Sequence, residues 1–306
     1  MNAQYLKTFS SIDFNRIIDH PNILIAAGFW DEDRYKAAKI CYKYMRAIDD
    51  LIDCHKSAHT RIADEEKKQF LDSVQAWIAM SQNAGKNGNS GHDLMDTINR
   101  FHIPAWPLEA FAKSMIYDID NSGFRTVSDF LSYSQGASVA PASIFVHLSG
   151  LIRNGDEYLP PAFDVRSAAT PCAIFSYLVH IIRDFQKDQD NNLNYFADDA
   201  MERNGLTAAD LYSMAHGQPI SNGFREMIRE YCMLADQYQQ QTHDVIRNIW
   251  PMLEPRYRLS LRIIFNLYRM VFKRIDPVHG NFTSTELNPT PEEIKKEVYE
   301  TIMLFE

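Results

Sequence analysis

Two short segments of the sequence carry the same arrangement of carboxylates. Asp49 and Asp53 form one pair and Asp184 and Asp188 form another, with four residues from one partner to the next. On a helix, residues four apart lie on the same face, one turn from each other. Like charges at this spacing repel, and Mg²⁺ offsets that repulsion because it prefers carboxylate oxygens, waters and substrate phosphates. Two such helices facing each other would present four carboxylates to a diphosphate bridged by magnesium.

An arginine accompanies each pair, since Arg46 precedes Asp49 by three residues and Arg183 directly precedes Asp184. Arginine binds phosphate oxygens through parallel hydrogen bonds. The alternative is that each pair is a solvated acidic face, which is the usual meaning of one such pair on a helix. Apolar residues flank both pairs here, and the motif occurs twice. Both observations favour a metal and diphosphate site over a solvated face.

Helical periodicity dominates the elements that must position these residues. Apolar side chains recur at helical spacing over 33–54, which carries the first aspartate pair. Further helices are predicted over 64–82, 92–101, 106–121, 127–152, 167–190, 207–215, 221–248, 255–275 and from Pro291 onward. Segment 277–290 is predicted to be a loop, and no strand is predicted. The sequence therefore predicts an all-α fold, with one domain over residues 1–306.

Composition narrows the class of partner. Apolar residues make up 45% and charged residues 23%, the balance of a soluble globular protein. The net charge of −9 disfavours nucleic acid, whose affinity comes mainly from lysine and arginine. The four cysteines form no CxxC pair, so neither a zinc site nor a redox motif is indicated, and a reducing cytoplasmic compartment is expected. The sequence indicates no oligomeric state.

Membrane insertion is not expected. The N-terminus lacks the apolar core of a signal peptide. Residues 130–152 contain no Asp, Glu, Lys or Arg, but they include five serines, a proline and a histidine. A bilayer span needs about 20 predominantly apolar residues. We therefore predict a buried core helix over 130–152 and no transmembrane segment, and any contact with a membrane surface would be transient.

The motifs, and the order in which they follow one another along the chain, resemble those of the squalene/phytoene synthase family. The residues that carry the resemblance are Tyr42, Arg46, Asp49, Asp53, Arg183, Asp184, Asp188 and Tyr195. The helix of small residues led by Tyr133 is also similar, as are Ala235-Asp-Gln-Tyr238 and Leu267-Tyr268-Arg269. The resemblance covers about residues 20–276. It implies a class I isoprenoid (terpenoid) synthase bundle around a central apolar cavity. Members of this family condense two prenyl diphosphates head to head and release diphosphate.

The resemblance also implies residue roles. Magnesium would be bound by Asp49, Asp53, Asp184 and Asp188, diphosphate by Arg46 and Arg183, and the reaction centre would be lined by Tyr42, Tyr133 and Tyr195. Metal ions and arginines neutralise the departing diphosphate, and an apolar cavity with aromatic faces suits the allylic cation left behind. The substrate would be a C15 or C20 prenyl diphosphate. No GxGxxG is present, so the sequence does not support NADPH as a cofactor.

If the four aspartates only bind metal, folding does not need them. Neutralising one carboxylate then relieves repulsion in the metal-free protein. We therefore expect Asp49→Asn or Asp184→Asn to abolish turnover and leave the fold intact.

The sequence departs from the family at two places. The family's serine-rich segment with a basic residue is replaced by Asp19-His20-Pro21-Asn22-Ile23, and the usual Gln and Asn before the second aspartate pair are Tyr177 and His180. His180 lies four residues before Asp184, which predicts a contact with diphosphate; the alternative is a structural histidine. Two other functions therefore stay open. One is a non-catalytic assembly or binding protein with this fold, and the other is a class I terpene cyclase.

Overall fold

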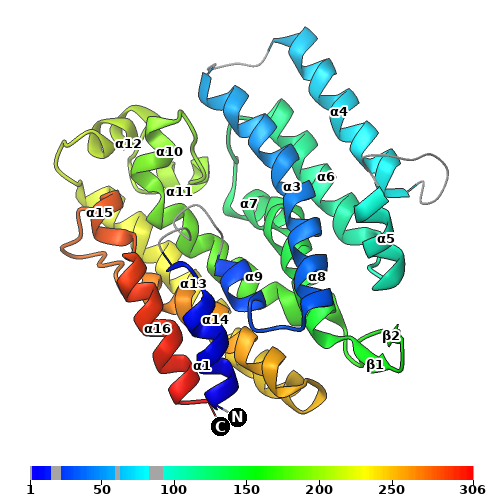
Figure 1. Cartoon of the computed structure of the whole chain (residues 1–306). Coiled ribbons are helices and arrows are strands. Elements are labelled where there is room, and N and C mark those ends of the chain that lie inside the picture. The colour runs from blue at the N-terminus through cyan, green and yellow to red at the C-terminus, as the bar shows by residue number, and fades with distance from the viewer. Residues whose placement is uncertain (1, 15–21, 59–62, 83–91, 306) are drawn as a thin grey trace.

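The computed structural model describes residues 2–14, 22–58, 63–82 and 92–305, and helices account for most of them (Figure 1). The α-helices are α1 (Asn2–Ser11), α2 (Asn22–Ala27), α3 (Glu32–Ala58), α4 (Asp64–Gln82), α5 (His92–Arg100), α6 (Trp106–Asp120), α7 (Val127–Ser134), α8 (Ala140–Gly150), α9 (Val165–Arg183), α10 (Phe185–Asp190), α11 (Asp198–Arg203), α12 (Ala208–Ala215), α13 (Asn222–Ile249), α14 (Pro255–Phe272), α15 (Ser284–Leu287) and α16 (Pro291–Met303). A π-helix η2 (Gln135–Val139) joins α7 to α8, and a short 3₁₀ helix η3 (Trp250–Met252) follows α13.

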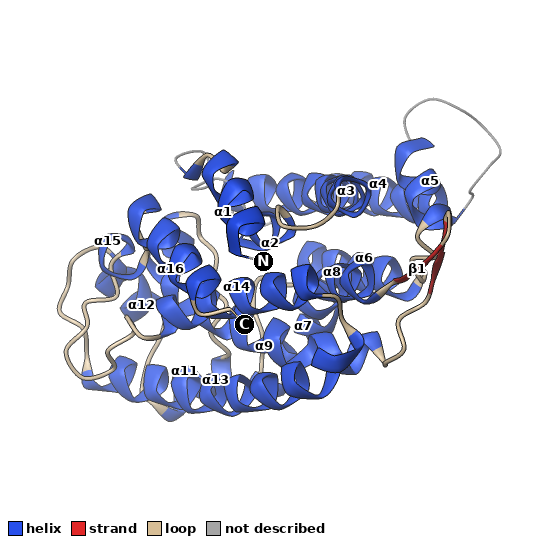
Figure 2. Cartoon of the chain, turned by 60° about the horizontal axis from the view of Figure 1, so that its bottom comes forward, coloured by secondary structure: helices blue, strands red, loops and turns tan. Residues whose placement is uncertain are grey.

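Helix α9 lies at the centre of the bundle. It packs against α13 on one side and α8 on another, and α7 and α14 also contact it. Helix α8 in turn packs against α3 and α6, and α6 against α4. Figure 2 shows α3 and α4 along one side of the molecule and α13 along the opposite side. Helix α3, which carries Asp49 and Asp53, and helix α9, which ends just before Asp184, are therefore both adjacent to α8.

The apolar core consists of two clusters of buried side chains. One involves mainly α3, α6, α8, α14 and α16. The other surrounds α9 and α13 and includes α11 and α12. Ala142 and Tyr268 pack against both clusters, so the clusters meet near the middle of the bundle. The all-α fold is confirmed, and the single domain over residues 1–306 stays a prediction.

Four of the long predicted helices agree with the structure to within three residues at each end, whereas α3 continues four residues beyond the predicted segment 33–54. Helices α4, α6, α13 and α14 correspond to the predicted segments 64–82, 106–121, 221–248 and 255–275. The short helices α1, α2, α11 and α15 were not predicted, because four to ten residues give too little periodicity to recognise. Helix α15 lies inside the segment predicted to be a loop.

One segment for which no strand was predicted forms a small hairpin. Strands β1 (Ile152–Asn154) and β2 (Glu157–Leu159) pair antiparallel, with Asn154 opposite Glu157. Gly155 has a φ of 64° in the connecting turn, a conformation that glycine adopts without steric cost. The dipeptide Gly155-Asp156, which forms the two-residue loop, was the available sequence signal, since glycine at the first loop position favours short hairpins.

Two predicted helices are interrupted at places that bear on the site. The segment 167–190 divides at Asp184 into α9 and α10. The segment 127–152 contains the π-helix η2 just before Pro141, which lacks an N–H group and cannot continue the α-helical hydrogen-bond ladder. Residues in the second half of that segment are mostly buried, which confirms the predicted core helix.

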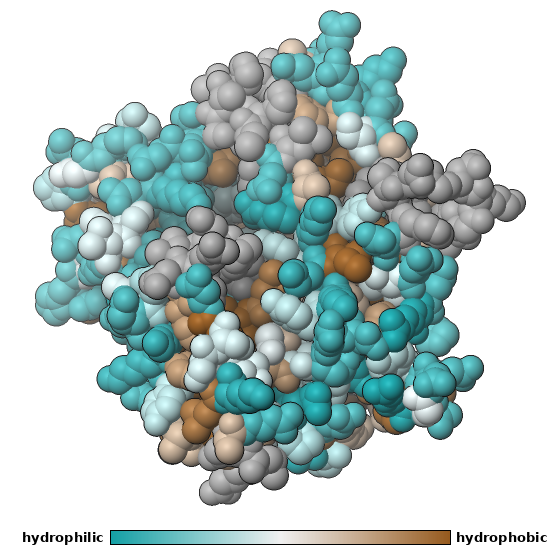
Figure 3. Space-filling model, viewed as in Figure 1, coloured by the Kyte–Doolittle hydropathy of each residue, from teal (hydrophilic) through white to brown (hydrophobic). Residues whose placement is uncertain are grey.

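Among the described residues, one helix is long and apolar enough to cross a membrane. This is α9, and 56% of its most apolar window is buried inside the protein. Its contacts with α8, α13 and α14 are those of a core helix. The face of the molecule in Figure 3 is mainly hydrophilic, and its apolar atoms form small separate patches.

Candidate active site

A polar cavity of about 490 Å³ lies between α3 and the α9–α10 segment. Most of the residues singled out from the sequence line it, namely Arg46, Asp49, Tyr133, His180, Asp184, Asp188 and Tyr195. The two aspartate-bearing segments therefore line one cavity. Asp53 is on α3, but its side chain lies outside the described residues, as does the departure at residues 19–21.

On the α3 side, one arginine holds two carboxylates. The Nη1 atom of Arg46 lies 2.7 Å from Oδ2 of Asp49, and its Nη2 atom lies 2.5 Å from Oδ1 of Asp50. Burial alone would lower the pKa of Arg46, but the carboxylates of Asp49 and Asp50 raise it. Asp50 also lines the cavity and was missed as a site residue. Its position four residues after Arg46 was the available signal.

On the α9 side, two side chains hold Asp184. Arg183 donates through Nε to Oδ1 at 2.7 Å and through Nη2 to Oδ2 at 2.9 Å. The Nε2 atom of His180 lies 2.6 Å from Oδ2 of the same carboxylate. Burial alone would raise the pKa of Asp184, but His180 and Arg183 together hold it well below its usual range. Asp184 is therefore ionised and already paired.

Asp188 reaches the same cavity although the helix is interrupted at Asp184. The backbone N–H of Asp188 donates to the carbonyl of Asp184 at 2.8 Å, which preserves the helical spacing across the break. Lys187 and Asn191 also line this part of the cavity. Arg183 does not line the cavity and acts through Asp184. This part of the wall therefore offers acceptors and one cation to a charged ligand.

Aromatic rings cover the wall of the cavity that adjoins these charges. The ring centroids of Tyr133 and Tyr177 are 6.3 Å apart, and those of Tyr177 and Tyr195 are 6.2 Å apart. The hydroxyl of Tyr133 donates to Oδ2 of Asp118 at 2.5 Å. Burial, together with Tyr177 and Asp118, raises the pKa of Tyr133 well above its usual value. Tyr177, found in the sequence only as a departure from the family, thus joins two predicted site residues.

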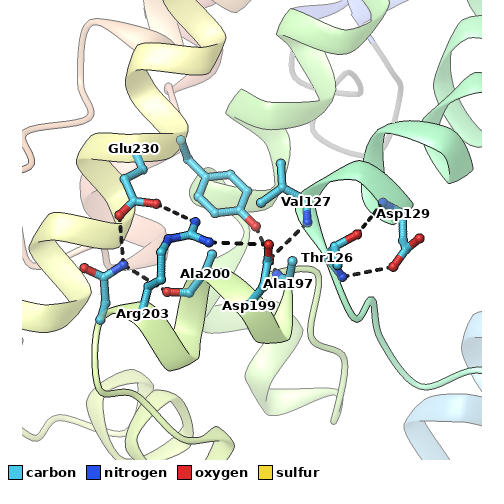
Figure 4. A network of polar contacts seen from close by, with 10 residues as sticks. Thr126, Val127, Asp129, Ala197, Asp199, Ala200, Arg203 and Glu230 are labelled. Atoms are coloured by element: carbon cyan, nitrogen blue, oxygen red, sulfur yellow. Dashed lines mark hydrogen bonds and ion pairs between the residues drawn. The ribbon is translucent and has the colours of Figure 1, made fainter.

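A polar network behind this wall fixes the start of α7, the helix that carries Tyr133 (Figure 4). Arg203 on α11 lies 2.9 Å from Glu230 on α13 and 3.4 Å from Asp199. Asp199 accepts a hydrogen bond from the backbone N–H of Val127, the first residue of α7. The N-terminus of α7 is thereby tied to α11 and, through Arg203, to α13.

The same network fixes the loop that carries Tyr195. The backbone N–H of Ala197 donates to the hydroxyl of Tyr231 on α13 at 3.0 Å (Figure 4). Asn194 accepts from the N–H of Phe196 at 3.1 Å and so orders the turn on either side of Tyr195. Both aromatic elements are therefore held on α13, which itself packs along α9.

A second cavity of about 210 Å³ adjoins the first and is mainly apolar. Tyr42 lines this cavity rather than the polar one. Four residues line both cavities, namely Ala137, Ser138, Ser176 and Tyr268. Three of them are small, which keeps the passage between the cavities open. Tyr268, quoted from the sequence only for its resemblance, is thus a site residue.

The π-helix places two of these small residues at the junction. Ser138 donates to the carbonyl of Ala173 on α9 at 2.9 Å. Gly136 lies so close to α6 that an added Cβ would be 2.1 Å from the carbonyl oxygen of Ala110. The close approach of η2 to α6 and α9 therefore requires glycine at one position and small side chains at the next two.

The donor chemistry of the polar cavity fits magnesium. Asp49 and Asp188 bring carboxylate oxygens from two facing elements to one cavity. Within the part of the chain that the structure describes, no group of three or more acidic, histidine or cysteine side chains is preassembled as a metal cage. Magnesium usually binds one or two carboxylates and completes its shell with waters and substrate phosphates, so a ligand-dependent site is the expected arrangement.

Facing aspartate-bearing helices above a polar cavity, with an apolar cavity adjoining it inside an all-helical bundle, define a class I isoprenoid synthase. The family model for squalene/phytoene synthase matches residues 21–291, and the chain belongs to that family. Members of this family are prenyl transferases.

Individual relatives are distant in sequence. The chloroplastic phytoene synthase of Narcissus pseudonarcissus is 21% identical over 255 residues, which are 82% of this chain and 56% of that protein. The chain thus spans little more than half the length of this curated relative.

Solved structures share the fold at low identity. A dehydrosqualene synthase in complex with a ligand has a TM-score of 0.65 at 17% identity, over 96% of this chain and 97% of that chain. YisP from Bacillus subtilis subsp. subtilis strain 168 has a TM-score of 0.60 at 12% sequence identity, over 97% of this chain and 96% of that chain. Squalene synthase HpnC from Alicyclobacillus acidocaldarius has a TM-score of 0.57 at 12% sequence identity, over 81% of this chain and 96% of that chain.

Proposed function

We propose that the protein is a Mg²⁺-dependent prenyltransferase that condenses two prenyl diphosphates head to head and releases diphosphate. One observation carries this proposal: carboxylates and cations from two facing elements line a polar cavity that opens into an apolar one. A prenyl diphosphate has this division into a charged end and an apolar chain. The charged end would lie between α3 and α10, and the chain would extend past the small residues of η2.

The residues of the polar cavity would bind and neutralise the diphosphate. Asp49 and Asp188, with Asp53, would hold magnesium, which supplies positive charge where the leaving group develops negative charge. Arg46 and Lys187 are the cations of the cavity wall that can contact phosphate oxygens directly. Arg183 acts differently, because it keeps the buried carboxylate of Asp184 ionised and oriented.

The aromatic wall would stabilise the carbocation. The faces of Tyr133, Tyr177 and Tyr195 border the cavity next to the diphosphate site, and a cation is attracted to an aromatic face. The raised pKa of Tyr133 keeps its phenol protonated, and its hydroxyl donates to Asp118. The apolar cavity excludes water, which would otherwise capture the cation.

The test is turnover by purified protein supplied with C15 or C20 prenyl diphosphate, with Mg²⁺ or EDTA, and with or without NADPH. We expect magnesium-dependent release of diphosphate and a product that contains two prenyl chains, formed without NADPH. A product from one substrate molecule would instead identify a terpene cyclase. Binding without any release of diphosphate would contradict the proposed activity.

The pairing of Asp184 favours a second candidate, a non-catalytic binding protein with this fold. A carboxylate already bonded to Arg183 and His180 is less available to a metal ion. Under this alternative, prenyl diphosphate would bind with equal affinity in Mg²⁺ and in EDTA. Isothermal titration under both conditions separates the two candidates, because the proposed enzyme requires tighter binding with the metal.

A further inference from the structure

Helix α13 presents two overlapping stripes of side chains to two different cavities. The stripe facing the apolar cavity consists of Thr242, Val245, Ile246 and Ile249. The stripe facing an outer pocket of about 600 Å³, between α13, α14 and α16, consists of His243, Ile246, Arg247 and Trp250. Each stripe has the i, i+3, i+4, i+7 spacing of one helix face, and the two are offset by one residue. Ile246 belongs to both.

Helix α14 is divided in the same way but shares no residue between its two faces. Leu261, Ile264 and Tyr268 line the apolar cavity, whereas Arg262, Phe265, Asn266 and Arg269 line the outer pocket. Of the described residues that line either cavity, Ile246 alone lines both. The wall between the apolar cavity and the outer pocket is therefore one side chain thick at Ile246.

The outer pocket has a surface that an apolar chain can follow. Trp250 and Phe265 contribute aromatic faces to it. Arg262 stacks over the ring of Trp250 at 4.6 Å from its centroid, and His243 packs against Phe265 at 4.7 Å. A chain that passed Ile246 would therefore contact these rings beside charged side chains that also line the pocket, namely Arg247, Arg262, Arg269, Glu297 and Glu300.

We propose that Ile246 sets the length of the prenyl chain that the site accepts, a specificity that rests on the proposed prenyltransferase function. With the diphosphate anchored at the aspartates and arginine of the polar cavity, the chain runs past Ser138 and Ser176 into the apolar cavity. That cavity has a volume of about 210 Å³. The protein as it stands prefers a C15 substrate, because the five further carbons of a C20 chain meet the side chain of Ile246.

The test compares Ile246→Ala with Ile249→Ala. Both variants remove the same atoms from the same helix. Ile249 lines only the apolar cavity, whereas Ile246 lines both cavities, so only Ile246→Ala opens the wall between them. We expect the ratio of kcat/KM for C20 over C15 prenyl diphosphate to rise about tenfold in Ile246→Ala, in the range that pocket size gives for apolar chains. In Ile249→Ala the ratio should change less than about threefold, since the cavity gains only the volume of the removed atoms and does not join the outer pocket.

A binding measurement tests chain-length preference even if a variant loses turnover for an unrelated reason. Non-hydrolysable thio-diphosphate analogues of the C15 and C20 substrates are titrated into each variant with Mg²⁺, and Ile246→Val is included as a milder truncation. The C20 analogue should gain affinity in the order wild type, Ile246→Val, Ile246→Ala. An unchanged C20 to C15 preference, or an equal shift in Ile249→Ala, overturns the role of Ile246 and leaves the proposed function standing. If neither analogue binds any variant, both proposals are wrong.

Discussion

Replacing Asp184 by asparagine should reduce the stability of the protein as well as its activity. From the sequence alone we expected the opposite, because a metal ligand that repels its neighbour is not needed for folding. The structure revises that expectation, since Asp184 exposes 11% of its side chain and its partner Arg183 exposes 18%. Removing the carboxylate leaves a buried guanidinium without its counter-charge.

The size of the effect follows from this burial. Breaking a buried ion pair costs about 3–5 kcal/mol. We expect a loss near the lower limit, about 3 kcal/mol, because the amide oxygen of asparagine still accepts one hydrogen bond from Arg183. For a chain of this size that corresponds to a fall in Tm of about 5 °C. The Asp49→Asn variant is the control, because its partner Arg46 is 49% exposed and exposed pairs contribute about 1 kcal/mol or less.

Differential scanning calorimetry of metal-free protein measures both variants beside a turnover assay. Asp184→Asn should melt well below wild type, whereas Asp49→Asn should stay within about 2 °C of it. Both should lose turnover. Equal melting temperatures for the two variants would refute the reasoning that Asp184 is a structural partner of Arg183. Near-normal activity in Asp49→Asn would refute its assignment to the metal site, and near-normal activity in Asp184→Asn would refute the need for Asp184 in the site.

Two further predictions concern residues outside the metal site. The Nε2 atom of His147 lies 2.8 Å from the carbonyl oxygen of Phe101, and burial lowers the pKa of this histidine. Below about pH 6.5 the unfolded chain therefore binds a proton at His147 that the folded protein does not bind. The free energy of unfolding should therefore fall on acidification, by up to about 1.4 kcal/mol at pH 5.5 from this residue, and His147→Gln should remove that part of the slope in urea titrations. Gly136→Ala should destabilise the protein by about 1–3 kcal/mol, because the added Cβ would lie 2.1 Å from the carbonyl oxygen of Ala110. A variant as stable as wild type in the same titrations would contradict the close approach of η2 to α6.

The aspartate pairs show what a sequence can predict about such a site. Spacing of four residues was enough to put the two aspartates of each pair on one face, because helical geometry is local. That Asp49, Asp184 and Asp188 line one cavity depends on how α3 packs relative to α9 and α10. The break at Asp184 was not predictable in the same way. Its residues continue the helical pattern, and the interruption coincides with side-chain bonds to Arg183 and His180 that depend on burial.

Residues defined by packing between distant segments were beyond the sequence. Nothing around Ile246 distinguishes it from Ile249, since both continue one apolar stripe, and only the position of α14 and α16 separates them. Packing between distant segments also decides that Tyr42 lines the apolar cavity and Tyr133 the polar one. Tyr177 was visible as an unusual residue, but its place between two other tyrosines depends on how α7 and the loop after α10 are held.

The π-helix η2 also fixes the phase between the two helices that it joins. A π turn contains one residue more than an α turn, and one residue corresponds to a rotation of about 100° around a helix axis. Deleting a single residue from 135–139 would restore regular α-helix and turn α8 by that angle relative to α7. Tyr133 would then face the aspartates while Pro141 and Phe145, which line the apolar cavity, pointed elsewhere. The alignment of the polar and apolar halves of the site thus depends on chain length in this one turn, and not only on which residues occupy it.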